Sequence, residues 1–165
     1  MPTSPTSREF RDAVGMFATG VTVVTARANG FGHGMTANSF TSVSLDPMLV
    51  LVCVLKHAVM RKAIDEAGAF AASVLAGDQE DLARYFSDSG RPMGMAQFVP
   101  VDWRPSPVTG APLLDGALAF VECEVAAIHD AGDHDIAVGR VVDLGVAAEG
   151  SPLLFYRGGY GRFAV

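Results

Sequence analysis

The stretch TANSFTSVS, residues 36–44, places six hydroxyl or amide side chains between two apolar segments. Residues 21–25 (VTVVT) precede it and residues 48–55 (MLVLVCVL) follow it, and both are rich in the β-branched residues that favour strands. A buried polar group without a partner costs about 1–3 kcal/mol, so this polar band needs hydrogen-bond partners. Two solutions are open: a turn whose hydroxyls bond the backbone, or the lining of a flat, polar, phosphate-bearing ligand.

Length and composition predict a single domain over residues 1–165, because half of the residues are hydrophobic and only 18% are charged. The net charge of −6 argues against nucleic acid as a partner. Apolar runs stay well short of the ~20 residues of a membrane-spanning helix, and residues 1–7 lack the regions of a signal peptide. Cys53 and Cys123 lie far apart in apolar stretches, as expected of reduced thiols. We therefore expect a cytoplasmic protein that binds neither nucleic acid nor membrane, with residues 1–6 disordered.

Periodicity and turn residues predict about seven strands and three short helices. The helices are expected at about 7–17, after a capping box at Thr6 and Glu9, at 60–67, closed by Gly68, and after Asp78 as an N-cap. The strands are expected at 21–26, 31–35, 48–55 with both faces buried, 69–75, 117–128, 135–146 and 153–156. Glu122 and Glu124 are expected on the outer face of their strand. The elements do not alternate regularly, so we expect a mainly β fold, a closed or nearly closed antiparallel barrel plugged by helices.

Residues 87–112 depart from this pattern. Five prolines interrupt the segment, and its large apolar residues lack periodicity. Long irregular segments inside a domain are commonly functional. We expect a Pro-rich lid or an arm that reaches a partner subunit.

Three further stretches are candidates for chemistry. Lys56 and His57 stand where a buried strand meets a helix start, a seat for phosphate if the cations are not simply solvated. The run HDAGDHD, residues 129–135, is better turn chemistry than a metal cluster, so we expect no metal, and His134 is either a residue at a cavity mouth or a structural histidine. The glycine-rich tail around Tyr160 lacks a nucleotide-binding fingerprint but allows close approach to a planar ligand.

Five motifs in this order resemble the short-chain flavin reductases of two-component monooxygenases. They are FATGVTVVT (17–25), GMTANSFTSVSLDP (34–47), GAPLL (110–114), GDH (132–134) and PLLFYRG (152–158). The resemblance runs from about residue 10 to residue 163. It implies a split β-barrel homodimer that binds FAD or FMN at the subunit interface and takes hydride from NADH or NADPH. It also implies a partner monooxygenase that receives the reduced flavin.

The resemblance also implies which residues meet the cofactors. The flavin ring and ribityl chain would contact the band at Thr36, Ala37, Asn38, Ser39 and Ser42. The ribityl phosphate would follow the segment containing Cys53, Val54, Leu55, Lys56, His57 and Met60, flanked by Phe86 and Ser87. His134 would orient the nicotinamide as the residue closest to the chemistry, together with Arg157, Gly158 and Tyr160. Many relatives carry a serine-rich phosphate grip where this chain has KHAVM (56–60), so Lys56, His57 or the helix start would have to replace it.

Two other functions remain open from the residues. The chain would serve equally as a flavin-binding electron carrier or sensor without turnover, or as a barrel for another apolar ligand. The sequence leaves FAD against FMN and the monooxygenase served undecided. The absence of a strong basic cluster favours NADH over NADPH.

Overall fold

The computed structural model describes residues 4–147 and 149–163. The helices are α1 (Ser7–Val14), α2 (Val59–Ala67) and α3 (Glu80–Ser87), with a 3-10 helix η1 (Gly94–Phe98). The strands are β1 (Thr19–Gly20), β2 (Thr22–Ala28), β3 (Phe31–Ala37), β4 (Thr41–Leu45), β5 (Met48–Leu55), β6 (Ala69–Val74), β7 (Trp103–Pro105), β8 (Pro112–Leu114), β9 (Ala119–Ala131), β10 (His134–Val146), β11 (Leu153–Tyr156) and β12 (Gly159–Arg162). In this part of the chain no helix is long and apolar enough to cross a bilayer.

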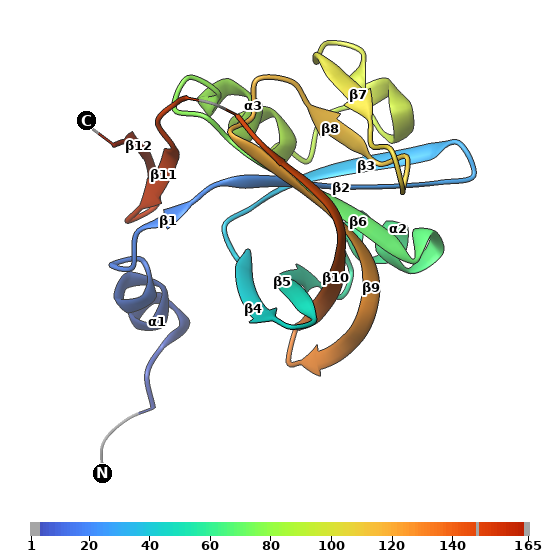
Figure 1. The fold of residues 1–165 in the computed structure, drawn as a ribbon. Coiled ribbons are helices and arrows are strands. Elements are labelled where there is room, and N and C mark those ends of the chain that lie inside the picture. The colour runs from blue at the N-terminus through green and yellow to red at the C-terminus, as the bar shows by residue number, and fades with distance from the viewer. Residues whose placement is uncertain (1–3, 148, 164–165) are drawn as a thin grey trace.

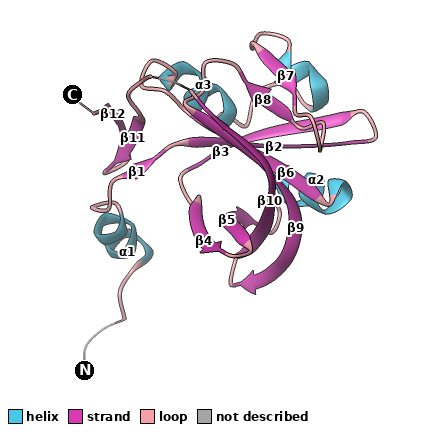
Figure 2. Ribbon diagram, in the orientation of Figure 1, coloured by secondary structure: helices cyan, strands magenta, loops and turns pink. Residues whose placement is uncertain are grey.

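Seven antiparallel strands form the main sheet, in the order β3-β2-β6-β9-β10-β5-β4. The two long strands β9 and β10 curve strongly and bend the sheet around its core (Figures 1 and 2). The core on the inner face includes Val24, Val52, Ile64 and Phe70. Among the described residues β3 and β4 stay unpaired with each other at the two ends of the sheet, so the sheet is not closed and the expected split barrel is confirmed.

The outer face of β5 is only half-buried, which corrects the expectation that both of its faces are covered. Val50, Val52 and Val54 point into the core, whereas Leu51 and Cys53 between them are partly exposed. The uninterrupted apolar run therefore hides an alternating pattern. Its outer half lacks a covering layer within the described part of the chain.

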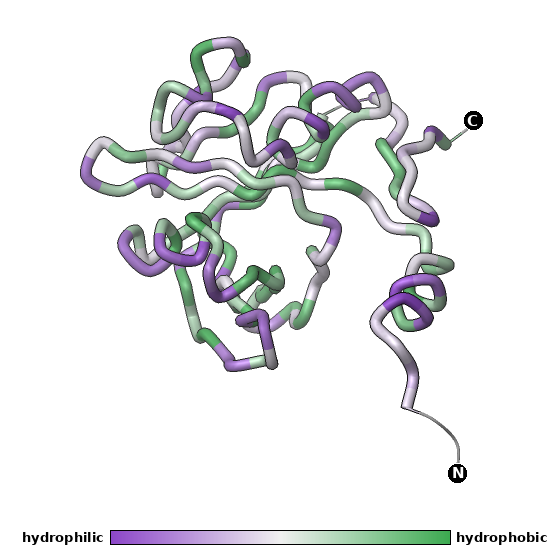
Figure 3. The backbone as a smooth tube through the Cα atoms, turned by 180° about the vertical axis from the view of Figure 1, so that it is seen from behind, coloured by the Kyte–Doolittle hydropathy of each residue, from purple (hydrophilic) through white to green (hydrophobic). Residues whose placement is uncertain are grey.

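A three-stranded sheet, β1-β11-β12, joins the C-terminal hairpin to the start of the chain. The Arg157 N–H donates to the Gly15 carbonyl just after α1, at 2.9 Å. Helix α1 itself stands beside this small sheet and away from the main one (Figures 1 and 3), and it buries none of its side chains. Its expected apolar face, which includes Phe10 and Val14, is therefore exposed.

The ends of the helices mostly follow local chemistry. Thr6 and Glu9 form the predicted capping box, so Thr6 is ordered, while residues 1–3 of the expected disordered segment lie outside the described residues. Gly68 ends α2 in the left-handed conformation, as expected. Asp78 does not cap α3, which starts one residue later than expected. Gln79 stands at the cap position, and its side chain bonds Ala76 and Asp115 instead.

The segment 87–112 is folded onto the main sheet of its own chain. The side chain of Gln97 accepts from the Gly34 N–H at 3.0 Å and donates to the Gly32 carbonyl at 3.2 Å. Arg91 donates to the Gly34 carbonyl. These side chains occupy the free hydrogen-bonding edge of β3, which protects it from pairing with another chain. Its role as a lid or as an arm that reaches a partner subunit stays a prediction.

Glu122 lies in the interior rather than on the outer face where it was expected. Its side chain is fully buried and accepts from the N–H groups of Val108, at 3.1 Å, and Thr109, at 2.6 Å. The side chains of β9 alternate between two faces as predicted, but the loop between β7 and β8 covers the face that carries Glu122. Glu124, two residues on, is exposed as expected.

His33 gives the fold an expected dependence on pH. The ring is buried, its Nδ1 lies 3.3 Å from the Gln97 amide nitrogen and its Nε2 lies 3.4 Å from an Arg91 guanidinium nitrogen. Both neighbours carry N–H donors, so an imidazolium would lack an acceptor. Burial first, and the Arg91 charge second, lower the pKa of His33 to about 4 from its ordinary value of 6.5.

The unfolded chain therefore binds a proton at this site near pH 6.5, whereas the folded chain does so only near pH 4. The contribution of His33 to stability is present above the upper value and is lost as the pH falls through this window, up to about 3 kcal/mol. Urea unfolding across the window should show a smaller loss for His33→Gln than for wild type. A control variant at the exposed His129 should follow wild type, and equal slopes in all three proteins would contradict the prediction.

Candidate functional site

A cavity of about 700 Å³ opens between α1, β1 and the loop from β3 to β4. We call it the main cleft. Asn38, Ser39, Phe40 and Thr41 form one side, from the polar band and its loop. The other lining residues are Val14, Gly15, Phe17, Ala18, Thr19, Gly20, Cys53 and Phe155. The cleft thus joins four segments that are far apart in the sequence.

A smaller cavity of about 180 Å³, the side hollow, adjoins the main cleft. Asn38 and Phe155 line both cavities, and Thr36, Ser87 and Tyr160 complete the side hollow with Val21. The structure therefore brings together residues from the predicted polar band, the end of α3 and the C-terminal tail.

The polar band combines the two predicted roles: some of its hydroxyls bond the backbone, and one of its side chains lines a cavity. The Ser39 hydroxyl accepts from the Cys53 N–H and contacts the Cys53 carbonyl, both at 3.1 Å, and the Thr36 hydroxyl donates to the Ala83 carbonyl at 2.6 Å. These hydroxyls bond the backbone of other segments and fix the loop on β5 and α3. Asn38, between them, is exposed and lines both cavities. The loop is anchored at its flanks and presents an amide to the cleft.

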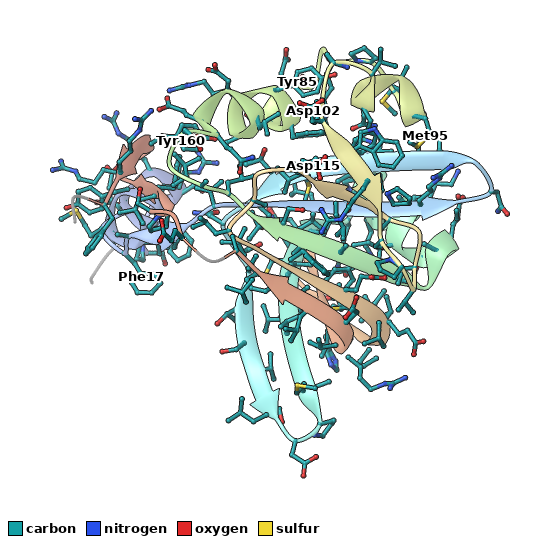
Figure 4. All side chains as sticks on the ribbon, turned by 45° about the horizontal axis from the view of Figure 1, so that its top comes forward. Phe17, Tyr85, Met95, Asp102, Asp115 and Tyr160 are labelled. Carbon is teal, nitrogen blue, oxygen red and sulfur yellow. The ribbon has the colours of Figure 1, made fainter. Side chains whose placement is uncertain are left out.

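Aromatic rings form the wall opposite the polar band. Phe155 and Tyr160 pack edge to face with centroids 5.3 Å apart. The Arg84 guanidinium lies over the Tyr160 ring at 5.0 Å, on the side of α3 (Figure 4). Flat apolar walls with a few polar groups at one edge are the usual lining of a small-molecule site. This cleft suits a planar ligand with a polar rim.

The hydroxyl of Thr19 adds a polar group to the cleft. Its Oγ1 is buried and has no hydrogen-bond partner among the described residues. Unpaired buried hydroxyls are uncommon in folded proteins and call for an explanation. Because Thr19 lines the main cleft, a ligand atom is a natural partner for it.

Lys56 and His57 lie in a separate cavity of about 670 Å³ at the start of α2, which we call the helix hollow. Lys56 forms an ion pair with Asp130. Ala58, at the N-cap of α2, offers no side-chain cap to the first turn. The phosphate seat stays a prediction, and within the described part of the chain the helix hollow shares no lining residue with the main cleft.

His134 lines a third cavity of about 630 Å³ with Thr6, Phe10 and Arg11, which we call the histidine hollow. Its Nδ1 lies 2.7 Å from Asp133, and this contact lowers the pKa of the Asp133 carboxyl. The ring is not part of the main cleft. It shares a sheet face with that cleft, however, because His134 pairs with Leu55 while its neighbour on the same face, Ile136, pairs with Cys53.

The remaining predicted residues divide between surface and core. Arg157 and Gly158 line a fourth cavity beside α1, and Ser42 and Leu55 are exposed. The side chains of Ala37, Val54, Met60 and Phe86 are buried in the core. These four side chains lie on the inner side of their segments, and contact of the segments with the cofactors stays a prediction.

Sequence reasoning missed the apolar part of the main cleft. Phe17, Thr19, Gly20 and Phe155 all lie within the quoted motifs, but none was selected as a site residue. Apolar residues and glycine carry no chemical signature of their own. Only the pairing of β1 with β11, which sets Thr19 opposite Phe155, reveals that they share a wall.

The chain matches a family model described as the flavin reductase like domain over residues 14–164. It is 46% identical over 156 residues to an NADH-dependent FAD reductase of Streptomyces globisporus, covering 94% of this chain and 85% of the relative. It is 40% identical over 153 residues to the reductase subunit HsaB of a flavin-dependent monooxygenase of Rhodococcus jostii, covering 93% of this chain and 76% of the relative.

Solved structures agree with these matches. The crystal structure of BorF, the flavin reductase component of a bacterial two-component tryptophan halogenase, superposes with a TM-score of 0.91 and 44% identity over 95% of this chain and 98% of that one. A Streptomyces globisporus NADH:FAD oxidoreductase in complex with NAD and FAD fragments gives a TM-score of 0.92 and 43% identity over 99% of this chain and 97% of that one.

Proposed function

Because this chain belongs to the flavin reductase-like domain family, we propose that it is an NADH-dependent flavin reductase that passes reduced FAD or FMN to a partner monooxygenase. The relatives named as NADH-dependent FAD reductase and as HsaB support this activity and this kind of partner. The observation in the molecule that carries the proposal is the main cleft, with Asn38 on one side and Phe155 on the other.

The residues of the cleft fit a flavin. A tricyclic ring offers a flat apolar surface to Phe155 and a rim of carbonyl and N–H groups to Asn38. The unpaired Thr19 hydroxyl supplies one further hydrogen-bonding group. Ser39 would support the site indirectly, because its hydroxyl bonds the backbone of Cys53, which forms part of the wall.

The bound flavin would supply the redox chemistry by accepting hydride from the nicotinamide. The protein's task is to hold the two rings together and to keep water out. No side chain has to act as an acid or base in that step. Asn38, Thr19 and the aromatic wall would therefore be binding and orienting residues.

We also propose a homodimer, which is supported by apolar surfaces that the described part of one chain leaves open. Phe10 and Phe17 beside the cleft are 64% and 76% exposed, and Leu45 on the β4–β5 hairpin is 89% exposed. The half-buried outer face of β5 and β10 runs from Cys53 in the main cleft to His134. A second copy on this face would turn the open cleft and the histidine hollow into one enclosed site.

Two free thiols, Cys53 and Cys123, favour a cytoplasmic location.

His134→Ala tests whether the imidazole orients the nicotinamide. The KM for NADH should rise about tenfold, a loss of about 1.4 kcal/mol, while the Kd for flavin should change less than about twofold. The exposed His129 on the neighbouring strand provides the control, and His129→Ala should leave both constants unchanged. An unchanged KM for NADH in His134→Ala would remove His134 from the site.

Steady-state turnover with the four pairings of NADH or NADPH with FAD or FMN tests the function itself. We expect oxidation of NADH that depends on added flavin, with NADPH the poorer donor. Binding of flavin without oxidation of either nicotinamide would identify a carrier or sensor and would refute the reductase.

A further inference from the structure

A fourth cavity, of about 500 Å³, lies between α1 and the turn from β11 to β12. Arg11 and Arg157 line it from opposite sides, with Asp12, Gly15, Met16 and Gly158. We call it the arginine hollow. Gly15 also lines the main cleft, and Arg11 also lines the histidine hollow. The arginine hollow is therefore adjacent to both places to which the proposed reaction is assigned.

One residue fixes the two arginines relative to each other. The Gly15 N–H donates to the Arg11 carbonyl at 2.8 Å, and the Gly15 carbonyl accepts from the Arg157 N–H at 2.9 Å. A Cβ on Gly15 would lie 2.9 Å from the Arg11 carbonyl oxygen and 3.7 Å from the Arg157 Cα. The helix end itself therefore requires glycine at this position, whereas the turn lies at an ordinary van der Waals distance from it.

Arg157 occupies a turn position that disfavours it. Its φ is +51°, and Gly158 follows with φ +78°. Two-residue hairpin turns of this type favour Asn, Asp or Gly at both central positions, and a left-handed arginine costs about 1–2 kcal/mol. The turn needs no guanidinium for its own geometry. A function outside the turn would account for the side chain.

The two guanidinium groups are also free of ion pairs. Within the described residues, neither Arg11 nor Arg157 lies within salt-bridge distance of a carboxylate, whereas Arg61, Arg84, Arg104 and Arg140 each do. The hollow carries two positive charges against the one carboxylate of Asp12, in a chain of net charge −6. Guanidinium pairs bind phosphate oxygens with strong, charge-assisted hydrogen bonds.

We propose that Arg11 and Arg157 hold the diphosphate of the reduced dinucleotide, with its nicotinamide end passing Gly15 into the main cleft. This inference rests on the proposed reductase function and adds the residues that select the dinucleotide. It also assigns Asp12 an opposing role, because its carboxylate repels the same phosphates. A diphosphate is common to NADH and NADPH, so the hollow does not distinguish them.

Charge-removing variants test the assignment by steady-state kinetics. The variants are Arg11→Gln, on the helix, and Arg157→Asn, which suits the left-handed turn and should fold at least as well as wild type. Each should raise the KM for NADH about tenfold with little change in kcat or in the Kd for flavin, and each should raise the KM for NADPH by the same factor. Asp12→Asn should lower the KM for NADH. Arg8→Gln removes the same charge from an exposed position on α1 and should change none of these constants.

Reduced nicotinamide mononucleotide, which lacks the second phosphate and the adenosine, serves as the probe for the diphosphate. Its KM should rise less than that of NADH in both arginine variants. A rise confined to NADPH would assign the arginines to the ribose phosphate and overturn the inference. Unchanged KM values in folded variants, with normal wild-type turnover, would also overturn it and leave the reductase function standing. A wild type without turnover would refute the reductase function instead.

Discussion

Gly20→Phe is expected to abolish flavin binding while the protein stays folded. Gly20 lines the main cleft, and a Cβ built on it meets no heavy atom within 4 Å. Its backbone is outside the positive-φ region, so a side chain is sterically acceptable there. A phenyl ring would then occupy the space assigned to the flavin. The Kd for FAD should rise at least about 30-fold, a loss of about 2 kcal/mol.

Gly161→Phe is the matched control. Gly161 on β12 also has free space at its Cβ and an ordinary φ, but it is not among the lining residues of the main cleft. It should bind FAD as wild type does. Thermal unfolding and light scattering on both variants separate a blocked cleft from a lost fold or a lost dimer. Full FAD affinity in Gly20→Phe would place the flavin elsewhere.

Phe17→Asp is expected to dissociate the proposed dimer and to remove most of the turnover. The ring of Phe17 is 76% exposed and points away from the strands (Figure 4), and α1 buries no side chain in its own chain. Burying one phenylalanine contributes about 1.5–3 kcal/mol, and a twofold interface counts it twice. The dimer Kd should therefore rise at least about 100-fold, while the folded monomer keeps its stability.

Val146→Asp tests whether any exposed apolar residue has this effect. Val146 is 79% exposed and ends β10, at the end of that strand opposite to His134. It should leave the molar mass in solution and the turnover unchanged. A Phe17→Asp protein that remains dimeric and active would exclude the segment between α1 and β1 from the interface.

The sequence predicted local structure well because local chemistry decides it. Asn29 and Gly30 adopt the positive φ values of a tight hairpin turn, and Gly68 ends α2 as expected. It was harder to predict which loops and side chains cover the faces and edges of the strands. The buried position of Glu122 depends on a contact with Val108, fourteen residues earlier in the chain, and the open edge of β3 is protected by Gln97, more than sixty residues away. Such contacts leave no periodic signal.

In the candidate site too, some residues could be predicted from the sequence and others could not. The polar band could be recognised because hydroxyls and amides between two apolar strands need partners, and Asn38 does reach the main cleft. Met60 and Phe86 were assigned through the resemblance, which marks a segment but not the side that its residues face. Phe155 and Gly20 could not be found at all, since their contribution is a surface and a space rather than a reactive group.

The most direct test of the account is a crystal structure of the protein with FAD bound. We expect the isoalloxazine ring to lie in the main cleft, against Phe155, with Asn38 and the Thr19 hydroxyl within hydrogen-bonding distance of its polar rim. A flavin ring seated in the helix hollow beside Lys56 and His57, with the main cleft free of ligand, would contradict it.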